Sequence, residues 1–186
     1  RQLRMQRHDF INHLQVIYAL LQMDESDQAM EYMDKVYKDL QRVGSLLKTK
    51  SSAVNGLLAA KSVQGEKRGI RMAFDITTGL GDLPLEDWEL CRVLSNLIDN
   101  AMDAAESSQD AAVELKLWED IQGLRFRVTN RGPMIPVEMR ERIFLPGVTT
   151  KGDRGTGMGL HIVDSILREH GGAIELHSDE TETSFE

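Results

Sequence analysis

The chain has 186 residues, of which 41% are hydrophobic and 28% are charged, proportions that exclude a disordered or fibrous protein. This length allows one ordinary domain, with or without a small helical attachment, and excludes two large domains. The 30 acidic residues outnumber the 22 basic ones, and no basic cluster is interleaved with aromatic residues, so nucleic acid is not an expected partner.

The single cysteine, Cys91, cannot form an internal disulfide, which favours a reducing, cytoplasmic compartment. No hydrophobic run approaches the roughly 20 residues that span a bilayer, and no signal peptide is evident. We therefore expect this segment to make no direct membrane contact. The chain opens within a helical pattern and without an initiator methionine, so we expect it to be a segment of a longer protein.

Two amphipathic helices are predicted at the N-terminus. Hydrophobic residues follow one helical face at Leu3, Phe10, Leu14, Ile17 and Leu21 and, after a polar break at 23–27, at Met30, Met33, Val36, Tyr37, Leu40, Val43 and Leu47. A hairpin cannot bury both hydrophobic faces fully, so we predict a homodimer in which two hairpins form a four-helix bundle. The alternative is that the hairpin packs on the rest of its own chain.

From residue 51 onward, helices alternate with strands. Periodicity predicts helices at 54–67, 86–107 and 159–170, a short helix at 137–143, and strands at 70–76, 113–118, 124–129 and 173–177. Residues 119–123 are typical of a hairpin connection. We predict an α+β fold with the helices on one face of the sheet, and domains at 1–50 and 51–186.

His8 is the first candidate for chemistry. At about 100° per residue it projects roughly 140° from the centre of the first hydrophobic stripe, so it faces solvent or another molecule. Asp9 is placed to accept or orient the imidazole proton. A solvated surface histidine remains an alternative, whereas a metal ligand is disfavoured because no histidine or carboxylate follows His8 at the i+4 position.

The helix predicted at 86–107 carries a polar face. Glu89, Asn96, Asn100 and Asp103 line up there within roughly 60°. Asparagine is a mediocre helix former, so two asparagines four residues apart in a helix indicate that their amides interact with a polar partner. Amide oxygens suit a Mg²⁺ ion that already receives charge from phosphates. The alternative is a solvated face.

Gly155, Gly157 and Gly159 alternate just before a hydrophobic helix. Backbone amides without a neighbouring Cβ can approach an anion, and the N-terminus of the following helix favours phosphate. The run follows a polar segment, which argues against a dinucleotide-binding G-x-G-x-x-G, and no G-x-x-x-x-G-K-[ST] occurs. The pattern allows a lid from which Lys151 or Arg154 reaches nucleotide phosphates, with a plain loop as the alternative.

The order of these features resembles that of the sensor histidine kinases of two-component systems, over nearly the whole chain. The segments that carry the resemblance are "RHDFINHLQ", "LSNLIDNAMDA", "VTNRGPMIP", "IFLPGVTTK", "GTGMGLHIV" and "ETSFE". The similarity is in particular to the citrate- and dicarboxylate-sensing group, in which a sporulation-phosphotransferase-like hairpin precedes a GHKL-type α/β sandwich that binds ATP.

The resemblance implies a role for each matching residue. His8 would be phosphorylated, with Asp9 as its proton acceptor, Asn100 would hold Mg²⁺, and Asn96 would approach the phosphates. The implied ATP-binding set is Asn96, Asn100, Asn130, Gly132, Lys151, Gly155, Gly157, Gly159 and Ser184. The resemblance also implies phosphoryl transfer to a response-regulator aspartate, a hinge at 48–52, and a membrane-anchored parent protein.

Two residues depart from the family pattern. The family has an aspartate that accepts a hydrogen bond from the adenine amino group where this chain has Asn130, whose amide accepts such a bond without supplying charge. Met134 replaces a glycine beside the expected base pocket. These departures keep open a phosphotransfer or docking module with degenerate ATP binding. A GHKL ATPase or serine kinase that uses the hairpin only as a dimer clamp is a further alternative.

Overall fold

The computed structural model describes residues 14–37, 49–81, 83–149 and 157–186. The chain divides into two compact units, Arg1–Arg42 and Val43–Glu186, which are described separately. Five candidate residues lie outside the described ranges: His8, Asp9, Lys151, Arg154 and Gly155. Within those ranges, no helix is both long enough and apolar enough to cross a membrane.

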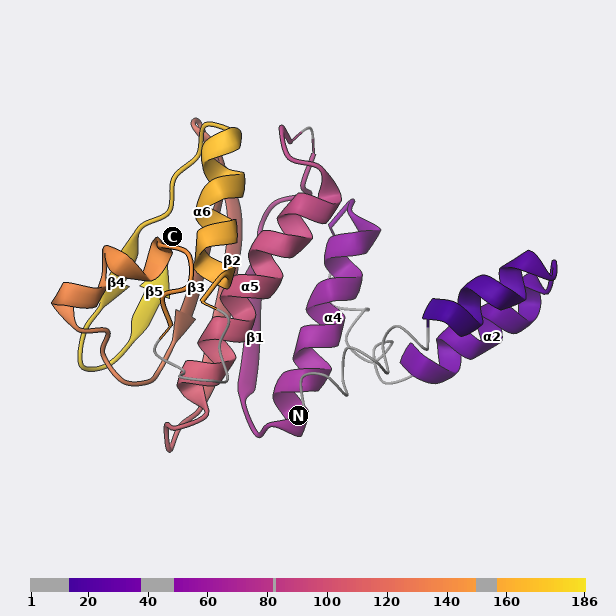
Figure 1. Cartoon of the computed structure of the whole chain (residues 1–186), viewed down its shortest axis with the longest axis horizontal. Coiled ribbons are helices and arrows are strands. Elements are labelled where there is room, and N and C mark those ends of the chain that lie inside the picture. Colours follow the sequence, from indigo (N-terminus) through magenta and orange to yellow (C-terminus); the bar gives the residue numbers. More distant parts are fainter. Residues whose placement is uncertain (1–13, 38–48, 82, 150–156) are drawn as a thin grey trace. The chain divides into compact units, whose positions relative to one another are not determined.

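The first unit contains the predicted helical hairpin. Residues 14–22 are helical, and helix α2 (Ser26–Tyr37) follows them after a tight turn (Figure 1). In this turn Asp24 adopts a φ of 59°, a left-handed conformation that aspartate tolerates better than most residues. The Glu25 amide donates to the Leu20 carbonyl over 2.9 Å. The polar break predicted between the two helices is therefore confirmed.

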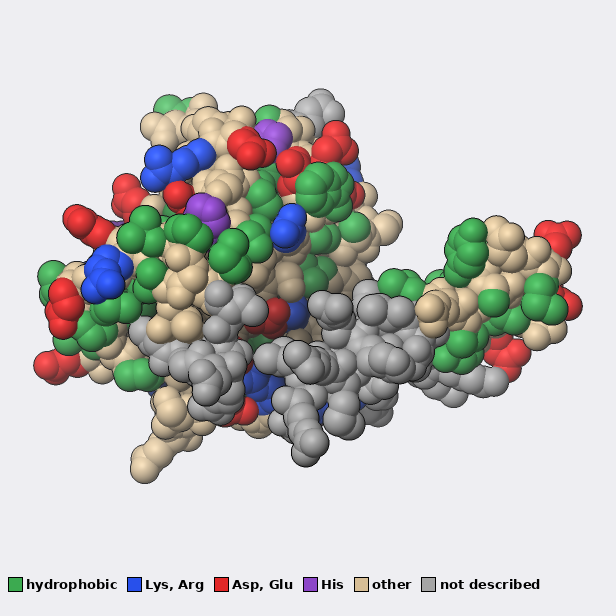
Figure 2. All heavy atoms as spheres, viewed as in Figure 1, with side chains coloured by type: hydrophobic (Ala, Val, Ile, Leu, Met, Phe, Trp, Pro, Cys, Tyr) green, Lys and Arg blue, Asp and Glu red, His purple; other side chains and the backbone are tan. Residues whose placement is uncertain are grey.

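The hairpin leaves much of its hydrophobic stripe on the surface. Figure 2 shows hydrophobic side chains exposed on this unit. Leu14 is 48% exposed, Leu21 51% and Met30 61%, whereas the small Ala29 is fully buried. One hairpin by itself therefore does not cover the hydrophobic face that its sequence pattern creates.

The second unit is built on a five-stranded sheet with the order β1-β2-β3-β5-β4. The strands are β1 (Arg71–Ile76), β2 (Ala112–Asp120), β3 (Gly123–Asn130), β4 (Leu176–Ser178) and β5 (Thr183–Phe185). β1 is parallel to β2, and the other neighbours are antiparallel. Helices α4 (Ser52–Lys67), α5 (Asp87–Ala105) and α6 (Gly159–Glu169) cover one face of this sheet (Figure 1), as the predicted α+β fold requires.

The core lies between the helices and that face of the sheet. Val113, Leu115 and Leu117 alternate along β2 toward the helices and are at most 1% exposed. Most of the hydrophobic stripe of α5 is also buried, with Leu94, Leu97 and Ile98 at 0%. Because α5 contacts β2, β3, α4 and α6, it is the central helix of the layer.

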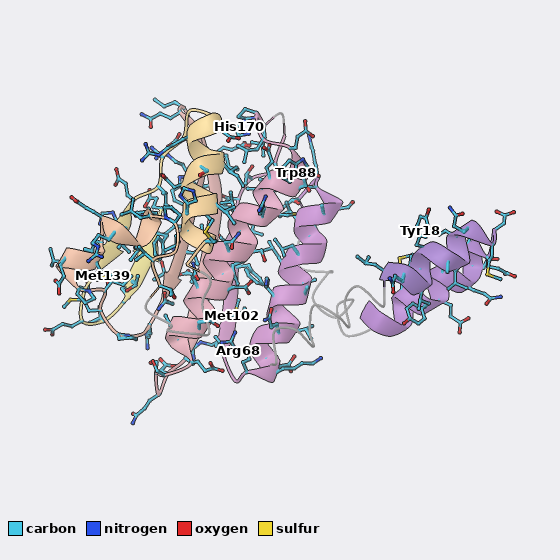
Figure 3. The ribbon with its side chains drawn as sticks, viewed as in Figure 1. Tyr18, Arg68, Trp88, Met102, Met139 and His170 are labelled. Carbon is cyan, nitrogen blue, oxygen red and sulfur yellow. The ribbon has the colours of Figure 1, made fainter. Side chains whose placement is uncertain are left out.

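α4 and α5 run parallel. At their N-terminal ends, the Ser51 hydroxyl donates to Asp87 over 2.7 Å, and Ser51 also caps α4 by accepting from the Val54 amide. At their C-terminal ends, Arg68 forms an ion pair with Asp103 at 2.8 Å. Figure 3 shows Arg68 near Met102 at this end of the layer and Trp88 at the other.

α6 runs antiparallel to α5. The Nε2 of His170, which follows the last residue of α6, lies 3.1 Å from a carboxylate oxygen of Glu89 in the first turn of α5. Figure 3 accordingly shows His170 and Trp88 at the same end of the helical layer. The first residue of α6 must then lie alongside the later turns of α5.

Two predicted elements differ from the structure. The helix expected at 137–143 is replaced by two 3-10 turns, η1 (Val137–Met139) and η2 (Arg142–Phe144). Only Ile143 is buried in these turns, and a single buried side chain provides too little packing to stabilise an α-helix. The strand expected at 173–177 is shorter and lies later in the chain, as β4 (Leu176–Ser178). The turn after α6 ends at Gly171, which has a φ of 73°, and residues 172–175 form no regular element.

Candidate functional site

Two asparagines of α5 face the start of α6. The Asn96 Nδ2 donates to the Arg92 carbonyl over 2.8 Å, which leaves its Oδ1 directed away from its own backbone. A Cβ placed on Gly159 would lie 2.9 Å from Asn96 Oδ1 and 3.8 Å from Asn100 Nδ2. The structure therefore brings together three predicted site residues, and the missing side chain of Gly159 leaves room for both amides.

The N-terminus of α6 offers its backbone amides at the same place. The side chain of the N-cap residue, Met158, makes no capping hydrogen bond, and the first turn of the helix contains no acidic residue. The first N–H groups of a helix lack intrahelical acceptors and carry partial positive charge. Together with the α5 amides, this end of α6 can accept an anion, and phosphate fits it by charge and by hydrogen bonding.

The loop that leads into α6 is closed at its base by two glycines. The Gly147 amide donates to the Gly157 carbonyl over 3.0 Å. Gly157 has a φ of 66°, and a Cβ on it would lie only 2.4 Å from the Gly147 carbonyl carbon. Any side chain at position 157 would push the two backbone segments at Gly147 and Gly157 apart. This predicted site residue therefore fixes how the backbone approaches the start of α6.

Asn130 ends β3 in the interior of the unit. It is only 3% exposed, and its Nδ2 is the one buried side-chain nitrogen or oxygen without a hydrogen-bond partner in the described part of the chain. Gly132 follows closely, and a Cβ on it would lie 3.1 Å from Asn130 Nδ2 and 2.7 Å from the Ala104 carbonyl. The backbone at 132 thus passes directly against α5.

The β3–β5 register decides which residue neighbours Asn130. Asn130 pairs with Thr183, whereas Ser184 pairs with Thr129 and with His177. Because alternate residues point to opposite faces, Thr183 lies on the helix-covered face with Asn130, and Ser184 lies on the other face. Ser184, the residue predicted from the sequence, therefore points away from Asn130, and only the pairing register distinguishes these two adjacent hydroxyl residues.

The loop after β3 is tied to β4. The Ile135 amide donates to the Ser178 hydroxyl over 2.9 Å, and Arg140 donates to the Ser178 carbonyl over 2.6 Å. The Ser178 hydroxyl also bonds to that of Thr183 at 2.7 Å. Met134, in the same loop, is 46% exposed at its surface.

Two members of the predicted polar face of α5 have structural partners instead. Glu89 accepts a bond from the Glu86 backbone amide and pairs with His170, and these contacts lower the pKa of the Glu89 carboxyl below its usual value. Asp103 pairs with Arg68. Asn96 and Asn100 are the members of that face that lie beside the start of α6, at Gly159.

A separate cavity of about 540 Å³ lies between η2, α6 and β4, and Phe144, His161, Asp164 and Arg168 are among its lining residues. The predicted site residues that the structure describes are absent from its lining, so the cavity is not assigned to the same site.

Comparison with known proteins adds family information. Residues 87–186 match the model of the "Histidine kinase-, DNA gyrase B-, and HSP90-like ATPase" family, and residues 1–49 match that of the alpha-helical domain of SpoOB-type sensor kinases. A probable C4-dicarboxylate sensor kinase of Halalkalibacterium halodurans is 31% identical over 183 residues, 95% of this chain and 34% of the relative. The sensor histidine kinase DcuS of Escherichia coli is 32% identical over 181 residues, 95% of this chain and 33% of the relative.

A solved structure shares the fold of the second unit. The nucleotide-free catalytic domain of histidine kinase ThkA superposes with a TM-score of 0.60 at 30% identity, covering 72% of this chain and 89% of that one. The chain spans about a third of the length of the curated relatives named above, at 34% and 33%.

Proposed function

Because the chain belongs to the histidine kinase-, DNA gyrase B- and HSP90-like ATPase family, in its sensor histidine kinase branch, we propose that it is an ATP-dependent histidine kinase core. The observation that carries this proposal is the meeting of Asn96 and Asn100 with the start of α6 at Gly159, where no side chain intervenes. That arrangement supplies amides and a helix N-terminus to one triphosphate.

We assign the ATP site to the residues around this meeting point. The phosphates would bind at the N-terminus of α6 with Asn96, Gly157 and Gly159, and the base would lie by Asn130 and Gly132. Thr183 takes the place first expected for Ser184, because it lies on the same face of the sheet as Asn130. Lys151 and Gly155 remain part of the proposal on sequence grounds alone.

Mg²⁺ fits the donors available at this site. Among the described residues, no group of three or more His, Cys, Asp or Glu side chains suits a metal ion. An ion held by one amide, the nucleotide phosphates and water needs no such group, and Asn100 is the residue that we expect to hold it. When bound, Mg²⁺ supplies positive charge beside the phosphate oxygens.

The proposed reaction transfers the γ-phosphoryl group of ATP to His8. A ring nitrogen of His8 attacks the phosphorus in line, the bond to the β-phosphate oxygen breaks, and ADP leaves. Neutral imidazole is abundant near pH 7, so Asp9 needs only to take or orient one proton. The phosphohistidine would then pass its phosphoryl group to an aspartate of a response regulator.

We further propose that the hairpin forms a homodimer. The exposed stripe of Leu14, Leu21 and Met30 supports this proposal, since a second hairpin would cover it in a four-helix bundle. The boundary between domains at 50/51 and a hinge at 48–52 remain our assignment. We place the segment on the cytoplasmic side of a membrane-anchored sensor by analogy with sensor kinases.

Incubation with γ-labelled ATP and Mg²⁺ tests the proposal. Wild-type chain should acquire label that is lost in acid and retained in base, as expected for phosphohistidine. His8→Gln should acquire none, while still binding ATP, and Asn100→Asp should lose most of the labelling. Labelling that survives in His8→Gln would instead favour an ATPase or serine kinase. A wild type that neither binds ATP nor acquires label would favour a phosphotransfer or docking module.

A further inference from the structure

The side-chain amide nitrogen of Asn130 is a buried hydrogen-bond donor without an acceptor among the described residues. The residue is 3% exposed, and its Nδ2 has no partner among the residues that the structure describes. Buried polar side-chain atoms in native proteins nearly always have a partner. A donor left unpaired in the protein alone therefore indicates an acceptor that arrives from outside the chain.

The described residues around this amide supply no acceptor for its Nδ2. A Cβ on Gly132 would sit 3.1 Å from Nδ2, so the glycine keeps that side of the amide clear. The hydroxyl of Thr183, the cross-strand neighbour of Asn130, already forms a hydrogen bond with the Ser178 hydroxyl. These neighbours thus leave the Nδ2 donor available to a planar group that brings its own acceptor.

We propose that Asn130 widens the base specificity of the site, so that 6-oxo purine nucleoside triphosphates bind as well as ATP. This inference rests on the proposed function, since it places the base beside Asn130. A side-chain amide has one acceptor, Oδ1, and two donor hydrogens on Nδ2. An ionised aspartate at the same position has acceptors only.

The two purine edges match the amide in opposite orientations. For adenine, Oδ1 accepts from the 6-amino group and Nδ2 donates to N1. For hypoxanthine or guanine, Nδ2 donates to O6 and Oδ1 accepts from the N1 hydrogen. A half-turn of the amide about its last side-chain bond interconverts the two patterns, whereas a carboxylate would face the O6 carbonyl with no hydrogen between two acceptors.

Competition binding tests this assignment on the 186-residue chain. ATP labelled on its α-phosphate is displaced by unlabelled ATP or by ITP, in Mg²⁺ at pH 8, so that an aspartate at position 130 is ionised. ITP carries the 6-oxo group without the 2-amino group of guanine, so the comparison isolates position 6 of the base. The chains compared are the wild type, Asn130→Asp and Asn130→Ala, each checked for folding by circular dichroism.

Wild type should bind ITP within about tenfold of ATP, and Asn130→Asp should raise the ITP-to-ATP ratio of Kd by roughly a further tenfold or more. Asn130→Ala should weaken both ligands together and keep the ratio near that of the wild type. A wild-type chain that binds ATP but discriminates against ITP as strongly as Asn130→Asp overturns the inference and leaves the proposed function standing. A wild type that binds neither nucleotide overturns both. If Asn130→Asp does not fold, the ITP-to-ATP ratios of Kd for the wild type and for Asn130→Ala still show whether the site accepts both bases.

Discussion

The substitution Gly159→Ala should weaken nucleotide binding while changing the free energy of unfolding only slightly. The added methyl would lie 2.9 Å from Asn96 Oδ1 and 3.8 Å from Asn100 Nδ2, closer to Asn96 than ordinary contact allows. The Asn96 oxygen is at the end of a rotatable side chain, so the amide can swing aside without moving either helix. We therefore expect the substitution to displace Asn96 from the phosphate-binding end of α6.

The magnitudes of the two effects differ. Alanine gains up to about 1 kcal/mol over glycine in helix propensity, and an off-rotamer Asn96 costs about 0.5–1.5 kcal/mol, so the free energy of unfolding should change by less than about 1 kcal/mol. Loss of one hydrogen bond to a charged phosphate costs about 1.5–3 kcal/mol, which weakens ATP binding roughly tenfold to a hundredfold.

Urea unfolding and a titration with Mg·ATP measure these two quantities on the same preparation. Gly56→Ala is the matched control, because it also replaces a helical glycine by alanine but meets no atom within 4 Å. It should stabilise the chain by up to about 1 kcal/mol and leave ATP affinity unchanged. An unchanged ATP affinity in Gly159→Ala, with the fold intact, would refute the assignment of Asn96 to the phosphates.

Three further substitutions probe the frame around the site. Gly132→Ala should cost about 1–3 kcal/mol in urea unfolding, because its methyl would lie 2.7 Å from a backbone carbonyl of α5 that cannot swing aside; a loss below about 0.5 kcal/mol would contradict this contact. Lys61→Met should cost about 1–2 kcal/mol, since the 2.6 Å ion pair joins a Lys61 side chain that is 11% exposed to an Asp99 side chain that is 43% exposed and partly screened by water. A double-mutant cycle with Asp99→Asn should return most of that loss as coupling energy. Bonds from the Thr181 hydroxyl and from nearby backbone amides lower the pKa of Asp179 from 3.8 to about 2, so its stabilising effect is complete above pH 4 and declines as the pH falls toward 2. Asp179→Asn should therefore lower the Tm more at pH 6 than at pH 3, and an equal loss at both values would exclude this cause.

The larger elements of the second unit follow closely from hydrophobic periodicity. The helix predicted at 86–107 is Asp87–Ala105 in the structure, and the one predicted at 54–67 is Ser52–Lys67. Long stripes repeat the 3.6-residue period several times, so the pattern is hard to mistake. The short helix expected at 137–143 lacked such a repeat, and local turns replace it.

The candidate site was predictable only where its geometry is local. Turn arithmetic along one helix was enough to place Asn96 and Asn100 on one face of α5. The choice between Thr183 and Ser184 depends on how a three-residue strand pairs with β3, which the sequence does not encode locally. Glu89 likewise shared the polar face, but its partner, His170, is contributed by a helix that is distant in sequence.

Helix α5 links these observations physically. On one side Lys61 of α4 holds Asp99, and on the other His170 holds Glu89, so α5 is fixed against both neighbouring helices at different heights. Its rotation is therefore set by contacts outside the site, and Asn96 and Asn100 are presented to Gly159 as a consequence. Asn96 and Asn100 are four residues apart and so share one face of α5. A small rotation of the helix would therefore move both amides together. Substitutions that break either the Lys61–Asp99 or the Glu89–His170 contact should therefore weaken ATP binding without touching the nucleotide.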